Sequence, residues 1–258
     1  MLKIIHHPLY ASDLHPGAPE SAARARVIYD RLHVHFETAV PSPATKEDLL
    51  RVHVPRHYYH VWAEGKEIRE AAFMAAGGAI LAGRLAMEGT PAFALTRPPG
   101  HHAGTNGFKG YCYFNNMAVA AASLLEAGLA RDVLIVDFDM HHADGTQDIF
   151  QSESRVTIID PEPAESGLYL ANLARALEKI ERADVIAVCA GFDLHRDDWG
   201  GMLETRDYHE IGRLIAGAAD RLAGGHRFAV LEGGYSIRNL GLCALAFCEG
   251  FHGEALDL

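Results

Sequence analysis

Residues 133–146 read Val-Leu-Ile-Val-Asp-Phe-Asp-Met-His-His-Ala-Asp-Gly-Thr, and they decide how the rest of the chain is arranged. The first four form a short apolar run, rich in β-branched side chains, that is typical of a buried strand. Acidic and histidine residues crowd together where that strand should end. Because side chains alternate between the two faces of an extended backbone, we expect Asp137, Asp139 and His141 to project the same way. A carboxylate and an imidazole on one face can share a divalent metal ion, so this stretch predicts half of a metal site.

Strand-like and helix-like segments alternate along most of the chain. We expect strands at 2–6, 92–96, 133–137, 155–160, 184–190 and 227–231, and helices at 20–36, 46–52, 56–64, 67–87, 115–126, 144–150, 167–182, 205–222 and 237–251. This alternation implies crossover connections and a sheet covered by helices on both faces. The predicted fold class is α/β, a three-layer α/β/α sandwich with a mostly parallel central sheet. No linker, repeat or low-complexity stretch interrupts it, so we expect residues 1–258 to form a single domain.

The long alanine-rich helix expected at 67–87 contains Gly77, Gly78 and Gly83. No strand precedes these glycines, which makes a phosphate-binding loop a poor interpretation. We interpret them as points where the helix packs closely against a neighbour.

The composition favours a soluble enzyme over a nucleic-acid-binding or membrane protein. The 258 residues are 49% hydrophobic and 22% charged, and the net charge of −11 comes without a basic stripe. The four cysteines form no Cys-x-x-Cys pair, as expected in a reducing cytosol. The N-terminus lacks the apolar core of a signal peptide, and the longest uncharged stretch, 71–83, is too short and glycine-broken to span a membrane. We therefore expect a cytoplasmic protein that binds neither nucleic acid nor membrane.

Three further strands are followed by polar residues at the same end. Strand 92–96 is followed by Arg97-Pro-Pro-Gly-His101-His102, strand 184–190 by Gly191-Phe-Asp193, and strand 227–231 by Glu232-Gly-Gly-Tyr235. Ligands of an open parallel α/β sheet bind outside the carboxyl ends of its strands. We therefore expect these residues to meet the 137–146 segment in one site.

Asp139, His141 and Asp193 would complete a metal site. Two carboxylates and one imidazole can hold a metal ion and leave a position open for water and substrate. Such an ion lowers the pKa of its water and polarises a carbonyl oxygen.

The remaining polar residues can supply proton transfer and hydrogen bonds. His101 and His102 can transfer protons near neutral pH. Asp137 and Asp144 can accept hydrogen bonds from imidazoles and fix their tautomers. Tyr235, after a Gly-Gly turn, offers a phenol that can hydrogen-bond an oxyanion. With the metal, these groups predict hydrolysis of an amide or a related acyl bond.

Five segments resemble the zinc-dependent histone deacetylase family, which includes the acetylpolyamine amidohydrolases. They are RPPGHHA (97–103), GYCYFNN (110–116), DFDMHHADGTQDIF (137–150), AGFDLHRDD (190–198) and EGGY (232–235). The segments follow the family's order and span most of the chain, which looks like a short, bacterial-type member. The resemblance implies the arginase/deacetylase fold, which agrees with the predicted α/β/α sandwich.

The same resemblance implies a role for each site residue and a class of substrate. The implied roles are zinc binding for Asp139, His141 and Asp193; general base and acid for His102, oriented by Asp144; electrostatic assistance for His101, paired with Asp137; polarisation of the scissile carbonyl for Tyr235; and lining of the acyl-lysine channel for Gly110 and Tyr111. The implied substrate is an acetyl or other short acyl amide of a lysine or polyamine-like amine, in a peptide or a small molecule.

Three departures from the family pattern concern the substrate channel. After strand 155–160 the family usually carries a long segment with a Pro-Gly-Thr-Gly motif, which provides one aromatic wall, whereas here only 161–166 intervenes. Its absence predicts an open site, or one completed by a partner subunit in an oligomer. Tyr111 replaces the usual channel Phe, and Trp199 stands where a Pro is common, so a bulky aromatic reshapes the rim.

A fourth departure concerns a structural potassium ion. The family's first potassium site uses a serine in the region where Ile159 or Asp160 stands here. This argues against a potassium ion near Asp137, although its main-chain ligands could persist.

Two alternative functions remain open on the sequence alone. The first is a binuclear manganese ureohydrolase of the same fold. That class has a tighter Asp-x-His-x-Asp string and a second Asp two residues after the distal one, where this chain has His195. The second is a non-catalytic module that binds acyl ligands.

Several other polar residues are expected to be structural. They are His6, His7, His15, His33, His35, His53, His57, His60, His142 and Glu232. The helix expected at 20–36 has a solvated face, with the alternative that Arg24 or Arg26 lines an internal channel.

Overall fold

Seven parallel strands form the central sheet in this computed structural model, which describes residues 1–255. The strands are β1 (Lys3–Ile5), β2 (Glu37–Ala39), β3 (Ala92–Ala94), β4 (Val133–Asp137), β5 (Val156–Ile159), β6 (Val185–Ala190) and β7 (Arg227–Leu231). Their order across the sheet is β2-β1-β3-β7-β6-β4-β5, and each neighbouring pair is parallel. Parallel neighbours need crossover connections, which the intervening helices provide.

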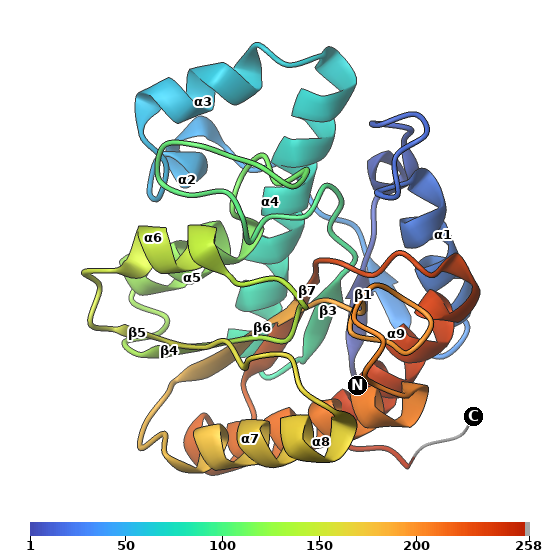
Figure 1. Cartoon of the computed structure of the whole chain (residues 1–258). Helices are drawn as coiled ribbons and strands as arrows, with labels where there is room; N and C mark the ends of the chain where they lie inside the picture. Colours follow the sequence, from blue (N-terminus) through green and yellow to red (C-terminus); the bar gives the residue numbers. More distant parts are fainter. Residues whose placement is uncertain (256–258) are drawn as a thin grey trace.

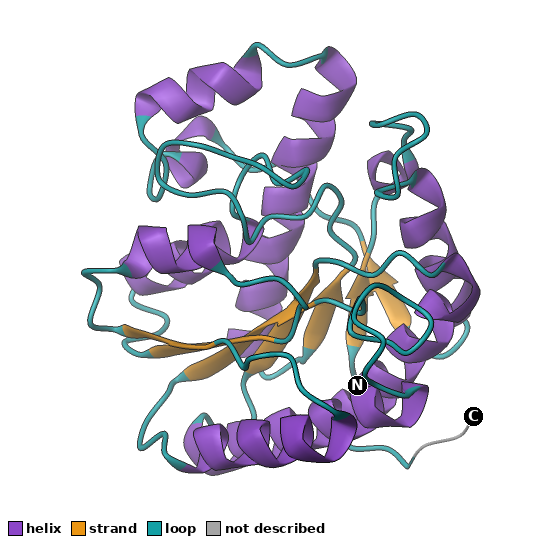
Figure 2. Cartoon of the chain, viewed as in Figure 1, coloured by secondary structure: helices purple, strands orange, loops and turns teal. Residues whose placement is uncertain are grey.

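Helices cover both faces of the sheet (Figures 1 and 2). One layer holds α2 (Lys46–Leu49), α3 (Pro55–Trp62), α4 (Lys66–Met87), α5 (Asn116–Glu126) and α6 (Asp144–Phe150). The other holds α1 (Ala22–Leu32), α7 (Ser166–Glu178), α8 (Thr205–Leu222) and α9 (Ile237–His252), and a short 3₁₀ helix, η1 (Pro8–Ala11), follows β1. The predicted α/β/α sandwich is therefore confirmed, with a sheet that is wholly parallel.

Every strand expected from the sequence is present, with bounds that differ by two residues at most. The sequence did not indicate β2, because its Glu-Thr-Ala segment is a short, largely exposed edge strand without an apolar pattern. The helix expected at 20–36 begins only at Ala22, since the buried Glu20 is bound to Arg97 instead of entering the helix.

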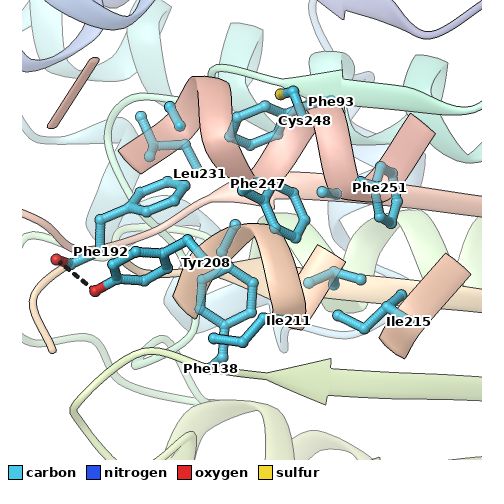
Figure 3. Packing of buried hydrophobic residues seen from close by; sticks show 14 of the residues in the cluster. Phe93, Phe138, Phe192, Tyr208, Ile211, Ile215, Leu231, Phe247, Cys248 and Phe251 are labelled. Atoms are coloured by element: carbon cyan, nitrogen blue, oxygen red, sulfur yellow. Dashed lines mark hydrogen bonds between the residues drawn. The ribbon is translucent and has the colours of Figure 1, made fainter. Parts of the chain in front are cut away.

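The core between the sheet and the α8–α9 layer fixes the loops that carry the acidic residues (Figure 3). Phe138 packs 5.2 Å from Phe247, and Phe192 packs 5.2 Å from Tyr208, whose hydroxyl donates a 3.0 Å hydrogen bond to the Phe192 carbonyl. Burial of an aromatic ring stabilises a fold by about 1.5–3 kcal/mol. Phe138 directly precedes Asp139, and Phe192 directly precedes Asp193, so these two packed rings hold the acidic backbone segments in place.

Helix α4 packs against α5 and the sheet through its small residues. Of the described helices, α4 alone is long and apolar enough to cross a membrane, yet 67% of its apolar window is buried inside the protein, as in a core helix. Gly77 faces the Ser42–Ala44 segment, and Gly78 faces the Tyr10 hydroxyl. The predicted close packing of these glycines is confirmed.

We expect Gly77→Ala to lower the free energy of unfolding by about 1–3 kcal/mol, because the new Cβ would lie 2.8 Å from the Ala44 nitrogen and 2.9 Å from the Pro43 carbonyl carbon. Gly217→Ala is the matched control, since that glycine lies on the exposed face of α8 with nothing within 4 Å of an added Cβ. The control should gain up to about 1 kcal/mol from helix propensity. Urea unfolding measures both, and equal stability of the two variants would contradict the packing role of Gly77.

Candidate active site

The polar residues that follow four strands meet at one edge of the sheet, because β3, β7, β6 and β4 are neighbours. Backbone N–H groups of one loop donate to carboxylates of the next. Gly233 donates to Asp139 Oδ2 at 2.7 Å, and Met140 donates to Asp193 Oδ1 at 2.9 Å. Gly100 donates to Glu232 Oε2 at 2.7 Å. The loops are therefore interlocked, and the expected convergence of these segments is present.

Asp139, His141 and Asp193 present their ligand atoms to one another. Nδ1 of His141 lies 2.9 Å from Asp139 Oδ1 and 3.1 Å from Asp193 Oδ2. These spacings approach the edge of about 3.3 Å that tetrahedral zinc coordination requires between ligand atoms. Among the described residues, Asp193 Oδ2 makes no hydrogen bond of good geometry although it is buried.

The electrostatics of the three residues favour a bound cation. Burial, followed by the charge of Asp139, raises the pKa of Asp193 to about 7. Hydrogen bonds to Asp139 and Asp193 raise the pKa of His141 to about 10. Burial opposes ionisation of Asp139, yet His101 and His141 outweigh it and hold the pKa of this carboxyl below its usual range. The backbone also lies close to these carboxylates, since a Cβ added to Gly233 would lie 2.6 Å from Asp193 Oδ2. The donor set therefore fits a divalent metal ion with nitrogen and oxygen ligands.

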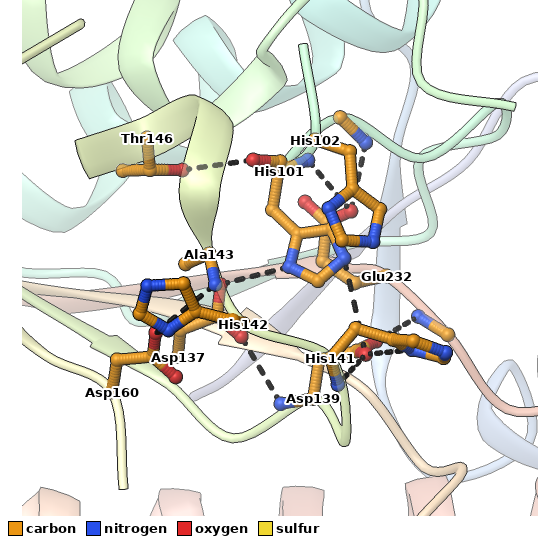
Figure 4. A network of polar contacts seen from close by, with 12 residues as sticks. His101, His102, Asp137, Asp139, His141, His142, Ala143, Thr146, Asp160 and Glu232 are labelled. Atoms are coloured by element: carbon orange, nitrogen blue, oxygen red, sulfur yellow. Dashed lines mark hydrogen bonds and ion pairs between the residues drawn. The ribbon is translucent and has the colours of Figure 1, made fainter. Parts of the chain in front are cut away.

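Two histidine–aspartate pairs lie beside the metal-ligand candidates, and Figure 4 shows one of them, His101 with Asp137. His101 Nδ1 lies 3.1 Å from Asp137 Oδ2, and His102 Nδ1 lies 2.7 Å from Asp144 Oδ1. Burial lowers the pKa of His101, but Asp139 and Asp137 outweigh it and raise that pKa well above its ordinary value. Burial, helped by His101, lowers the pKa of His102. Adjacent rings with opposite pKa shifts can serve as a standing cation and a neutral base.

Tyr235 is held between a guanidinium and an indole. The Trp199 ring stacks on the Tyr235 ring at 4.0 Å and 18°, and the Arg24 guanidinium carbon lies 4.9 Å from the centre of the same ring. Since the indole covers one face, the guanidinium lies over the other. Burial raises the pKa of Tyr235, so its hydroxyl stays protonated and can donate a hydrogen bond.

The backbone of the Tyr235 loop is fixed by buried charges from distant segments. Arg24 donates to the carbonyls of Gly234, at 2.5 Å, and Glu232, while Glu20 pairs with both Arg24 and Arg97. On the other side, Asp198 Oδ2 accepts the N–H groups of Tyr235 and Ser236, each at 2.6 Å. The sequence did not assign Asp198 a role. Its position in the 190–198 motif was the feature of the sequence that could have pointed to such a role.

Gly110 and Tyr111, the expected channel residues, both adopt left-handed backbone conformations, with φ of 57° and 64°. A Cβ on Gly110 would lie 2.8 Å from His102 Cδ2, so this segment lies against the His102 ring. The Tyr111 ring lies 4.9 Å from that of His15. The structure therefore places the expected substrate-binding segment next to the histidine pair.

His142 and Glu232, which were expected to be structural, hold loops in place. His142 pairs with Asp160 at 2.6 Å, and Asp160 also accepts the Ala143 N–H at 3.0 Å. Glu232 accepts the N–H groups of Gly100 and His101 at 2.7 and 3.2 Å. Burial raises the pKa of Glu232 to about 7.

The chain belongs to the histone deacetylase family. The model of the histone deacetylase domain matches residues 18–169 and 161–251. A protein named "Probable deacetylase" from Methanothermobacter thermautotrophicus is 32% identical, with 98% of this chain and 92% of that protein covered. The acetylpolyamine amidohydrolase of Mycoplana ramosa is 33% identical over 63% of this chain and 57% of its own length. The crystal structure of the HDA15 HD domain superposes with a TM-score of 0.84, at 26% identity, covering 98% of this chain and 91% of that one. Membership identifies the chain as a deacetylase-type hydrolase from a metal-dependent family.

The same comparisons agree with a missing segment after β5. The domain model matches in two pieces whose boundary falls within residues 161–169. The alignment with the Methanothermobacter protein is 310 residues long, although this chain has only 258, so the relative carries residues that have no counterpart here. The side chain of His141 is 34% exposed, which agrees with the open site expected from the shortened 161–166 region.

We expect His53 to destabilise the fold as the pH falls below about 6.5, because burial lowers the pKa of His53 to about 3. Its Nε2 accepts the Asn115 N–H, so protonation would break that bond. The unfolded chain binds the proton first, and stability should fall by up to about 1.4 kcal/mol per pH unit through this group. Urea unfolding between pH 7 and 5 should give a flatter profile for His53→Gln, and identical slopes would contradict the assignment.

Proposed function

We propose that residues 1–258 form a single zinc-dependent catalytic domain that hydrolyses an acetyl or other short acyl amide of a lysine or polyamine-like amine in the cytoplasm. One observation carries the proposal. Asp139, His141 and Asp193 present a metal donor set beside two histidines whose pKa values shift in opposite directions. The family of deacetylases and amidohydrolases supports this chemistry, and the acetylpolyamine amidohydrolase relative supports a small amine as substrate.

The proposed metal ligands are Asp139, His141 and Asp193. A zinc ion held there supplies Lewis acidity, which lowers the pKa of water and polarises a carbonyl. The chain's contribution is to hold the ligands rigidly, through the N–H groups of Met140 and Gly233 and the packed Phe138 ring.

His102 is the proposed general base and acid. Its lowered pKa leaves the ring neutral near pH 7, so it can take a proton from attacking water and pass it to the leaving amine. Asp144 orients the ring through Nδ1, and Lys109 holds the other Asp144 oxygen at 2.5 Å. The raised pKa of His101, paired with Asp137, suits a standing positive charge that stabilises negative charge in the transition state.

Tyr235 is the proposed oxyanion donor, and Gly110 and Tyr111 are the proposed contacts of the acyl-amine chain. Because Arg24 and Trp199 cover the two faces of the Tyr235 ring, little reorganisation is needed when charge develops on the substrate oxygen. The proposal does not require a potassium ion near Asp137, since the Asp160 carboxylate already ties the metal-ligand loop through Ala143.

The binuclear ureohydrolase alternative is less well supported. In that class the residue two positions after Asp193 would be a second metal ligand. Here it is His195, whose Nε2 lies 3.2 Å from the Thr205 hydroxyl and whose Nδ1 accepts the Asp197 N–H at 3.2 Å. Both ring nitrogens are therefore engaged away from the donor set.

We expect zinc-loaded protein to release acetate from acetyl-lysine or acetylpolyamine substrates and to bind about one zinc ion per chain. Asp193→Asn should lose the metal, because it replaces a charged ligand by a neutral amide of the same shape. Asp197→Asn is the control, since that exposed carboxylate contacts Asn239 at 2.8 Å. Metal analysis and an acetate assay measure both. Full zinc content in Asp193→Asn would contradict the ligand set, two manganese ions with urea chemistry would favour the alternative, and zinc binding without turnover across both substrate classes would contradict the enzyme.

We expect Tyr235→Phe to lower kcat by about two to three orders of magnitude with little change in KM, because the hydroxyl acts on charge that develops in the transition state. The phenyl ring keeps its contacts with Arg24 and Trp199, so zinc content and stability should match the wild type. Unchanged kcat would assign Tyr235 to packing alone.

A further inference from the structure

We infer that Trp199 is a specificity-determining residue, whose exposed indole binds the amine-bearing chain of the substrate as it leaves the metal site. The inference rests on the proposed function and extends it to the recognition of the amine. It concerns the aromatic wall of the substrate channel, which the shortened 161–166 region is expected to lack.

Trp199 contacts both the proposed oxyanion donor, Tyr235, and a proposed metal ligand, His141. Its ring stacks on that of Tyr235 at 4.0 Å, and it meets the His141 ring edge-on, with centres 5.9 Å apart and planes at 84°. An amide whose oxygen lies between the metal ligands and the Tyr235 hydroxyl is therefore within reach of the indole. Yet 53% of Trp199 is exposed to solvent. One face is covered by Tyr235, so the opposite face is the part that remains open.

The backbone beneath this indole is pinned to the site. The Trp199 N–H donates to Asp198 Oδ1 at 2.8 Å, while the other oxygen of Asp198 holds the N–H of Tyr235 at 2.6 Å. The next residue, Gly200, donates to the Asp193 carbonyl at 2.7 Å. A large exposed aromatic on a fixed backbone presents a preorganised binding surface, because little side-chain entropy is lost when a ligand packs on it.

The chemistry of this surface selects a linear, cationic amine. An alkyl chain attached to the amide nitrogen can lie on the open indole face, and an ammonium group at its far end can make a cation–π contact. The chain as a whole carries a net charge of −11, which favours cations further. The site is also shallow at this point, since His141 is itself 34% exposed.

The sequence allows a direct binding measurement, because Trp62 and Trp199 are its two tryptophans. Trp62 lies on α3, where the Arg69 guanidinium carbon is 4.7 Å from its ring centre. Trp62→Phe therefore leaves Trp199 as the single indole, and adding Tyr235→Phe slows turnover while keeping the stacked ring. We expect N-acetylputrescine to change the emission of zinc-loaded Trp62→Phe/Tyr235→Phe in a saturable manner. The neutral analogue N-butylacetamide should do so about two- to fivefold more weakly.

Kinetics separate binding on Trp199 from support of Tyr235. In an otherwise wild-type chain, Trp199→Ala should raise KM for N-acetylputrescine about tenfold and remove the preference over N-butylacetamide, whereas Trp199→Phe should retain much of both. A lower kcat with unchanged KM and unchanged preference would overturn the inference, because Trp199 would then act only through Tyr235. Calorimetric binding of N-acetylputrescine with no response of Trp199 emission would also overturn it. Hydrolysis of these amides by the wild type in either case would leave the proposed function standing. A zinc-loaded wild type that hydrolyses and binds neither amide would overturn the inference, and it would overturn the proposed function as well only if acetyl-lysine substrates also stay intact.

Discussion

Two buried carboxylates, on Asp139 and Asp193, face the same nitrogen of His141. The surrounding structure offsets the free-energy cost of burying these two groups together. Burying like charges close together is costly, and one consequence is the raised pKa of Asp193. The N–H groups of Met140 and Gly233 each donate to one of the two carboxylates. A divalent cation at the His141 nitrogen would neutralise the remaining charge, which is what the chemistry of this donor set favours.

The order of strands explains how residues distant in sequence share that site. Strands β7 and β6 lie between β3 and β4 in the sheet, yet the loop after β3 reaches the loop after β4, where His101 Nδ1 lies 3.1 Å from Asp137 and His102 Nδ1 lies 2.7 Å from Asp144. The N-terminal segment then closes the arrangement from the α1 side. Glu20, Arg24 and Arg97 are all fully buried. Arg24 donates to the Gly234 carbonyl of the Tyr235 loop, while Glu20 accepts hydrogen bonds from both arginines. Breaking one member of such a network leaves a buried charge uncompensated, so the site and the stability of this region are linked.

Features that depend on a local sequence pattern could be predicted from the sequence, whereas features that depend on contacts between distant residues could not. The bounds of β4 and β7 were predicted without error, because continuous apolar runs mark strands that are buried on both faces. The expected metal donors were brought together because parallel strands share a carboxyl edge, a rule that needs no knowledge of distant contacts. The edge strand β2 carried no pattern of this kind. The roles of Asp198 and Arg24 depend on which distant backbone groups they meet, and a single charged residue in a sequence does not specify its partner.

The shortened region after β5 lies apart from the segments that hold the proposed catalytic groups. Each proposed catalytic group is anchored by a strand end or by a hydrogen bond to one, such as the Gly233 N–H to Asp139, and none of those anchors passes through residues 161–166. A deletion there can therefore open the approach to His141 without disturbing the ligand geometry. What changes is the surface that the rest of the substrate meets. A deep channel selects by length and width, whereas an open site with one fixed aromatic face would select the amine by what can lie on that face.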